Sequence, residues 1–135
     1  MTERFERPTE ADLSRLAGMR ADYTDILGLE DPSDLSVEVL QDAIDRHLAA
    51  PEDTYRLQCL GVALGDLFCR LGDFEWRMID DEYGRDPTIA SKSRIWNLNA
   101  LTVISKRVQA REAFDVAGFI DFALTSSRTR GASVQ

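Results

Sequence analysis

The chain has few of the side chains that catalysis and metal binding use most often. Among 135 residues there is one histidine, His47, and there are two cysteines, Cys59 and Cys69. One histidine excludes a two-histidine zinc site and a facial triad of two histidines and a carboxylate. A Ser-His-Asp or Cys-His arrangement would have to use His47. We expect His47 near the end of a helix, where the C-terminus favours a cationic side chain, and we predict no catalytic residues.

Signature motifs and long apolar runs are also absent. The sequence contains no G-x-S-x-G, P-loop or G-x-G-x-x-G motif, so we expect a protein that is not an enzyme and has no cofactor. No segment approaches the roughly 18 apolar residues of a membrane span. Residues 1–10 are charged and hold no apolar run, which argues against a signal peptide.

The two cysteines stand ten positions apart in a segment that reads as one helix. Their separation along the helix axis is then roughly 15 Å, whereas a disulfide needs Cα atoms within about 7 Å. Neither cysteine has the spacing of a metal-ligand motif. We therefore expect reduced core cysteines and a cytoplasmic protein.

Positive charge is scarce in the first two-thirds of the chain. Residues 1–86 hold 21 acidic and 9 basic residues, a balance of -12, and residues 87–135 hold 3 and 7, a balance of +4. An acidic field repels nucleic acid and anionic membranes and speeds encounter with cationic partners. It indicates either a solvated surface or a face for a basic protein, with no nucleic acid and no membrane as partner.

Apolar residues recur at helical spacing in several segments. Thr9 and Asp12 match a capping box, and Gly28 can close the helix that follows. Inside a helix, Gly61 and Gly65 are each less favourable than alanine by about 1 kcal/mol. The usual compensation is close approach of a neighbouring backbone, so we expect one at these two positions. We expect helices over residues 9–28, 36–48 and 52–71, and two more that begin at Asn99 and Asp115.

After residue 72 the spacing of apolar residues changes from the helical period to a period of two. Phe74, Trp76 and Met78 alternate with charged residues, as in a half-buried strand. Residues 86–91, with Pro87 favouring an edge position, and residues 94–98 read as two further strands. The prediction is one α+β domain over residues 1–125, with N-terminal helices, a three-stranded antiparallel meander and two C-terminal helices, followed by a disordered tail over 126–135.

One acidic turn carries side chains of the kind that coordinate metal ions or bind basic partners. Asp80, Asp81, Glu82 and Asp86 place four carboxylates within seven residues, a density that calcium or magnesium favours. The EF-hand pattern is absent, and short acids also accept backbone N–H bonds in hairpin turns. Three interpretations stay open here: an ordinary hairpin turn, a partner-binding epitope and a metal site.

Several short motifs in the second half of the chain together form a pattern typical of one family. They are Leu60-Gly61, Leu64-Gly65, Leu71-Gly72, Glu75-Trp76, the stretch Asp81-Glu82-Tyr83-Gly84 with Asp86, and Lys106-Arg107-Val108. Through them, residues from about 57 to 124 resemble the bacterial domain-of-unknown-function family 3806. That family has no established reaction, so the resemblance implies a fold unit and no mechanism.

These observations favour a non-catalytic protein-binding module, in particular an immunity or antitoxin-like protein that neutralises a basic toxin. The alternatives are a regulatory domain that binds a small molecule or a divalent metal, and a structural subunit of a homo-oligomer such as a homodimer. We assign no metal ligands. The predicted partner-binding residues are Glu38, Asp42 and Asp45 on the second helix, and Glu75, Arg77, Asp80, Asp81, Glu82, Tyr83 and Asp86 on the hairpin.

Overall fold

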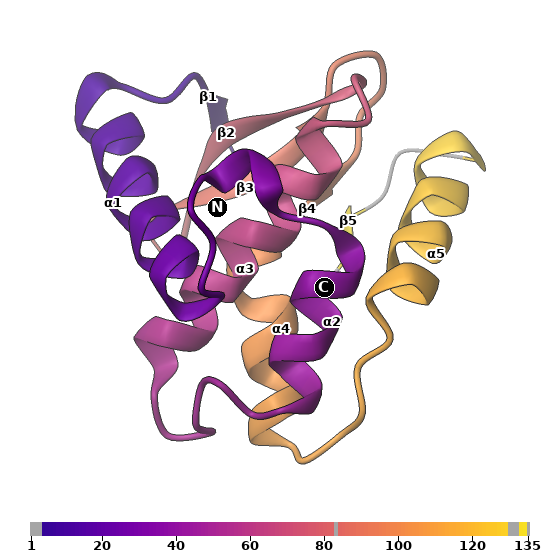
Figure 1. The fold of residues 1–135 in the computed structure, drawn as a ribbon. Coiled ribbons are helices and arrows are strands. Elements are labelled where there is room, and N and C mark those ends of the chain that lie inside the picture. The colour runs from indigo at the N-terminus through magenta and orange to yellow at the C-terminus, as the bar shows by residue number, and fades with distance from the viewer. Residues whose placement is uncertain (1–3, 83, 130–132, 135) are drawn as a thin grey trace.

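The computed structural model describes residues 4–82, 84–129, 133 and 134, and it combines helices with one mixed sheet (Figure 1). The sheet has the order β1-β2-β3-β4-β5, and only the pair β4–β5 is parallel. The α+β class predicted from the sequence is therefore confirmed. The strands are β1 (Arg4–Glu6), β2 (Phe74–Asp81), β3 (Gly84–Ser91), β4 (Asn97–Leu98) and β5 (Ser133–Val134).

The helices begin where the sequence places their caps. Thr9 and Asp12 form the predicted capping box of α1, and the Ser36 hydroxyl accepts the Val39 N–H at the start of α2. Asn99 precedes α4 as predicted, but its side chain forms no capping hydrogen bond. The helical segments are α1 (Glu10–Ile26), the 3₁₀ turn η1 (Pro32–Asp34), α2 (Val37–Asp45), α3 (Thr54–Cys69), α4 (Ala100–Gln109) and α5 (Val116–Thr129).

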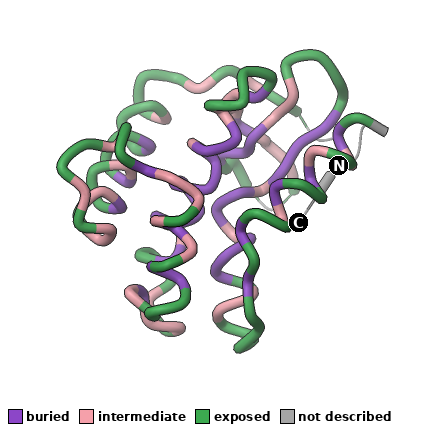
Figure 2. Tube along the Cα trace, turned by 45° about the vertical axis from the view of Figure 1, so that its right-hand side comes forward, coloured by how far each residue is buried: buried purple, intermediate pink, exposed green. Residues whose placement is uncertain are grey.

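Helix α3 runs through the centre of the molecule and contacts α1, α2, α4, β2 and β3. Figure 2 shows the buried positions gathered on the inward sides of the elements. At Gly61 an added Cβ would lie 2.6 Å from the Ala100 carbonyl oxygen, so the backbones of α3 and α4 are in contact, as predicted. At Gly65 the close neighbour is instead the Trp76 indole ring of β2.

Three details of the predicted sheet and tail are wrong. The sheet gains β1 and β5, which hold three and two residues and are too short to show a periodic pattern. Pro87 lies on β3, which pairs with β2 and β4 and is not an edge strand; β4 reaches only Ile89 and Ala90, so no β4 residue pairs with Pro87. Helix α5 includes 126–129, the first residues of the segment expected to be disordered.

Within the described residues, no helix is long and apolar enough to cross a lipid bilayer.

Candidate functional site

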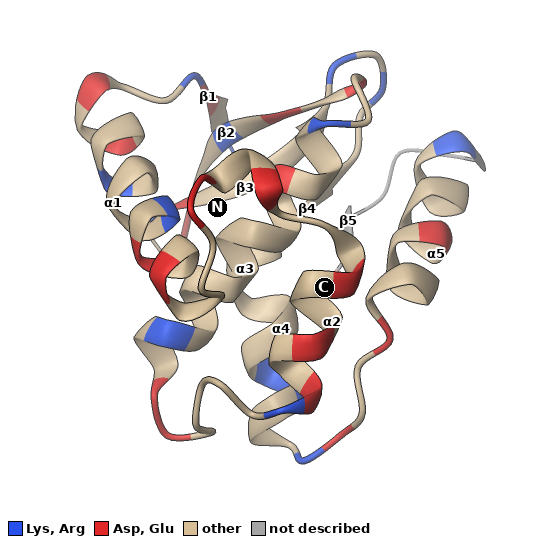
Figure 3. Cartoon of the chain, in the orientation of Figure 1, with Lys and Arg blue, Asp and Glu red and all other residues tan. Residues whose placement is uncertain are grey.

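Helix α2 carries an acidic exposed face. Its inner side buries Leu40 and Ala43 against the core. The outer side exposes Glu38, Asp42 and Asp45, which recur at positions i, i+4 and i+7 and therefore share one face. Figure 3 shows acidic positions along the length of this helix. The three predicted partner-binding residues of this helix therefore lie on one accessible surface.

A groove of about 660 Å³ separates α2 from the start of α5. Gln41 spans it, because its amide donates to the Phe114 carbonyl at 2.8 Å and accepts the Val116 N–H at 2.8 Å. This clamp brings Asp115 beside the α2 carboxylates. Asp115 was not among the site residues predicted from the sequence, because it lies 70 positions beyond Asp45. We call this the α2 acidic groove; its lining residues are Val37, Glu38, Gln41, Asp42, Asp45, Asp115 and Ala117.

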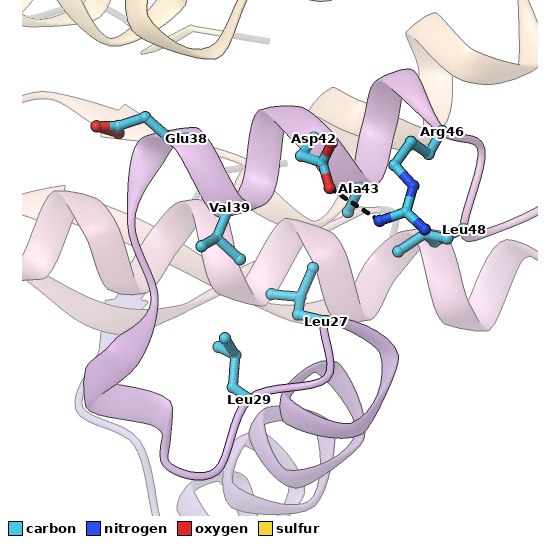
Figure 4. Close-up of a pocket in the computed structure, with 8 residues that line it drawn as sticks. All are labelled: Leu27, Leu29, Glu38, Val39, Asp42, Ala43, Arg46 and Leu48. Atoms are coloured by element: carbon cyan, nitrogen blue, oxygen red, sulfur yellow. Dashed lines mark hydrogen bonds and ion pairs between the residues drawn. The ribbon is translucent and has the colours of Figure 1, made fainter.

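A smaller hollow of about 280 Å³ lies on the other side of α2 (Figure 4). Val39 points into it from the helix, and Leu27 and Leu29 point into it from the connection that follows α1. The ion pair between Arg46 and Asp42, 3.1 Å long, borders the hollow together with Leu48. Apolar surface therefore lies directly beside the acidic face of α2.

The β2–β3 hairpin places its predicted site residues elsewhere. Helix α2 packs on α3 and α5, whereas the hairpin end pairs with β1, where Arg4 is opposite Asp80. Figure 1 shows β1 beside the start of α1 and away from α2. The structure therefore does not bring the two predicted acidic sets together.

Two acidic residues of the hairpin have arginine partners within the chain. Asp80 forms an ion pair with Arg4 at 3.3 Å, and Glu75 forms one with Arg77 at 3.4 Å. Glu82 and Asp86 are exposed, Asp81 is half-buried, and Tyr83 lies outside the described residues. These internal ion pairs reduce the negative field that the hairpin presents to a partner.

The remaining candidates for metal or thiol chemistry have no supporting geometry. In the described part of the chain, no group of three or more His, Cys, Asp or Glu side chains lies close enough to hold a metal ion. Cys59 and Cys69 both lie on α3 and are free thiols, so the expectation that they do not pair is confirmed. Burial raises the pKa of the Cys69 thiol to about 11, which keeps it protonated and unreactive at neutral pH.

A polar cluster around Asp66 was not predicted. The carboxylate accepts two hydrogen bonds from Arg20, at 2.7 and 2.9 Å, one from the Tyr23 hydroxyl at 2.7 Å and one from the Trp76 indole at 3.0 Å. Burial and the bond to Asp66 raise the pKa of Tyr23. Every polar group in the cluster has a partner, so it joins α1, α3 and β2 and leaves no group free for chemistry.

His47 follows α2, as expected, and lines a pocket of about 500 Å³. The opposite wall comes from the end of α4 and the segment after it. The amide of Gln109 donates to the Pro51 carbonyl at 3.1 Å and so holds α4 against the α2–α3 loop. We call this the His47 pocket; its lining residues are Ile44, Asp45, His47, Pro51, Val108, Arg111, Glu112, Ala113 and Phe114.

Comparison with known proteins supports the fold and supplies no activity. No curated protein matches the sequence. A crystal structure from Bacteroides thetaiotaomicron VPI-5482, solved at 1.50 Å resolution, has a similar fold, with a TM-score of 0.78 at 14% sequence identity. The match covers 93% of this chain and 48% of the other, so this chain spans about half the length of that protein.

The resemblance seen in the sequence is confirmed, and it starts earlier than the motifs suggested. The model of the domain of unknown function DUF3806 matches residues 36–119, from the N-cap of α2 into α5. The matched region therefore contains α2 and its acidic residues, which the motif-based resemblance left out. Because the match covers well over half of the chain, this protein belongs to the DUF3806 family.

Proposed function

We propose that the protein is a non-catalytic binding module that holds a basic protein partner on the α2 acidic groove, as an immunity or antitoxin-like protein holds its toxin. The observation that carries the proposal is the convergence of four carboxylates on one groove. Among the described residues, only one of the four, Asp42, forms an ion pair. The four are Glu38, Asp42 and Asp45 from α2 and Asp115 from the segment before α5.

Such a surface recognises a partner mainly through charge. Complementary fields steer two proteins together and raise the association rate, and they disfavour partners of the same charge. The apolar hollow formed by Leu27, Leu29 and Val39 lies on the other flank of α2. Lysine and arginine side chains can lay their aliphatic stems on apolar surface while their charged heads reach carboxylates. Basic residues of a partner therefore find both kinds of contact around one helix.

The choice of α2 over the hairpin rests on internal neutralisation. Arg4 forms an ion pair with Asp80 of the hairpin, and Arg77 forms one with Glu75. The hairpin acids consequently serve as a matched control: they carry the same charge in the same protein, on a surface that the proposal does not use.

The test compares two charge-reversal variants after the partner has been captured from the native host with the tagged protein. One variant is Glu38→Lys, Asp42→Lys, Asp45→Lys, and the control is Asp80→Lys, Asp81→Lys, Glu82→Lys. We expect the α2 variant to lower the association rate at least about tenfold and the control to change it less than about threefold. Thermal melting verifies that both variants are folded. Equal association rates for the α2 variant and the native protein would contradict the proposal.

A further inference from the structure

The His47 pocket is lined by two residues in an uncommon backbone conformation. His47 and Arg111 have φ angles of 55° and 59°, and they are the non-glycine residues of the described chain with positive φ. Both follow a helix in the same motif: Leu48 N–H donates to the Ala43 carbonyl after α2, and Glu112 N–H donates to the Arg107 carbonyl after α4. Glycine is the usual residue at this position because it has no Cβ to strain.

Helix α1 provides the comparison within the same molecule. It ends in the same motif, with Leu29 N–H donating to the Thr24 carbonyl, and there Gly28 takes the positive φ of 68°. The chain therefore uses glycine at the end of α1, where Leu27 and Leu29 line the smaller hollow, and keeps a side chain at the two helix ends that line the His47 pocket. Backbone strain retained at a pocket is a reason to infer that the side chains are needed there.

The charged groups of the pocket are available to a ligand. In the described part of the chain, the side chains of His47, Arg111 and Glu112 form no hydrogen bond or ion pair, and Asp45 accepts one hydrogen bond from Gln41. By contrast, Arg4, Arg20, Arg46, Arg56, Arg77 and Arg85 are all paired with carboxylates. The rim thus offers two basic and two acidic side chains.

The walls are apolar and held in place. Ile44 and Phe114 are almost fully buried, and Pro51 and Val108 complete the apolar lining. The Arg107 guanidinium lies 5.5 Å from the Phe114 ring centroid, and Gln41 bonds the Phe114 carbonyl, so this aromatic wall is fixed from two sides. A volume of about 500 Å³ is in the range of small-molecule sites.

We propose that the His47 pocket binds a small zwitterion with an apolar body, of the size of an apolar amino acid. Arg111 and His47 bind the carboxylate of the ligand, and Asp45 and Glu112 bind its ammonium group, together with the partial negative charge of two helix C-termini. The apolar body lies against Ile44, Val108 and Phe114. A pure anion meets the two acids and both helix ends, and a pure cation meets Arg111, so only a ligand with both charges uses the whole rim.

The first measurement is binding of L-leucine and L-phenylalanine to the native protein, followed by NMR chemical shifts and by thermal melting. Two analogues test the charge requirement: 4-methylpentanoate lacks the ammonium group of leucine, and 3-methylbutylamine lacks its carboxylate. We expect saturable binding of an amino acid and at least about tenfold weaker binding of each analogue. No saturable binding of either amino acid, or equal binding of one analogue, would overturn the proposal.

The second measurement separates ligand binding from stability. His47→Gly and Arg111→Gly relieve the strain of the positive φ, so we expect each variant to melt at the same or a higher temperature. We expect affinity for the amino acid to fall at least about tenfold in Arg111→Gly and several-fold in His47→Gly. Arg46→Ala, an exposed residue beside His47 that lines the other hollow, is the control and keeps full affinity. Full affinity in both glycine variants would show that these side chains do not hold the ligand.

Discussion

At the scale of single residues, the Asp66 carboxylate is notable because it accepts four hydrogen bonds from the side chains of three residues. Its side chain is 13% exposed, and it accepts hydrogen bonds from Arg20, Tyr23 and Trp76. A half-buried carboxylate with these partners is favourable only while all of them are present, because each unpaired donor would cost desolvation energy. The cluster is therefore a single unit that fixes α1 on α3 and β2.

Replacing Asp66 by alanine should lower the free energy of unfolding by about 2–4 kcal/mol, because Tyr23, Trp76 and Arg20 lose their shared acceptor. Urea unfolding followed by circular dichroism measures this change. The control is Asp42→Ala, which breaks an ion pair whose side chains are 64% and 60% exposed and should change stability by less than about 0.5 kcal/mol. A loss below about 1 kcal/mol in Asp66→Ala would mean that the cluster is not a stabilising unit.

The sequence could not predict this cluster, although it contained every member. Asp66 lies 46 positions from Arg20 and 10 from Trp76, and no local pattern links residues so far apart. The α2 acids were predictable because one helix places positions 38, 42 and 45 on a common face. Asp115 was not, because its segment reaches α2 through tertiary contacts such as the Gln41 clamp.

At the scale of elements, the contact between α3 and α4 depends on Gly61. A Cβ at this position would lie 2.6 Å from the Ala100 carbonyl oxygen and 2.8 Å from the Leu101 Cα. These are backbone atoms of α4, so no rotation of a side chain can make room. The absence of one methyl group thus sets how closely the two helices pack.

Gly61→Ala should therefore lower the free energy of unfolding by about 2–3 kcal/mol, even though alanine is the better helix former by about 1 kcal/mol. Gly18→Ala on α1 is the matched control, because a Cβ there meets no atom within 4 Å. We expect Gly18→Ala to stabilise the protein by up to about 1 kcal/mol. Thermal and urea unfolding of both variants provide the measurement, and changes of the same sign would refute this account of Gly61.

Helices were easier to predict than strands for a physical reason. A helix repeats its apolar pattern over several turns, and caps such as Thr9 and Ser36 mark its start. Strands β1 and β5 have three residues or fewer and form because a neighbouring strand offers backbone hydrogen bonds. Such pairing depends on tertiary structure, and nothing in the sequence Arg4-Phe5-Glu6 specifies it.

At the scale of the whole molecule, β1 and α1 precede the region that matches the family, yet they are joined to it by ion pairs. Arg85 of β3 contacts Glu6 at 3.0 Å and Asp12 at 2.6 Å, so one arginine links β3, β1 and α1. The hydrogen bond from Arg85, followed by the one from the Thr9 N–H, holds the pKa of Asp12 well below its ordinary value of 3.8. The attachment of the N-terminal segment should therefore depend on pH.

The lowered pKa of Asp12 determines how the stability of the protein changes with pH. A carboxyl with a lower pKa in the folded state stabilises the protein above its unfolded pKa, here 3.8, and loses that contribution as the pH falls through the folded-state value. Asp12→Asn carries no charge and lacks the contribution at every pH. We therefore expect the native protein to be more stable than Asp12→Asn at neutral pH, and the difference to shrink steadily as the pH falls below about 4.

Urea unfolding at a series of pH values from 7 down to about 2 measures both curves, and hydrogen exchange of residues 4–16 shows whether β1 and the first turns of α1 loosen first. Glu10→Gln is the control, since Glu10 lies in the same helical turn but in none of the described ion pairs; its curve should stay parallel to that of the native protein. A constant gap between the native protein and Asp12→Asn at all pH values would show that the Arg85 cluster does not couple the N-terminal segment to pH. A shrinking gap together with early exchange in β1 would show that acid releases this segment before the family core unfolds.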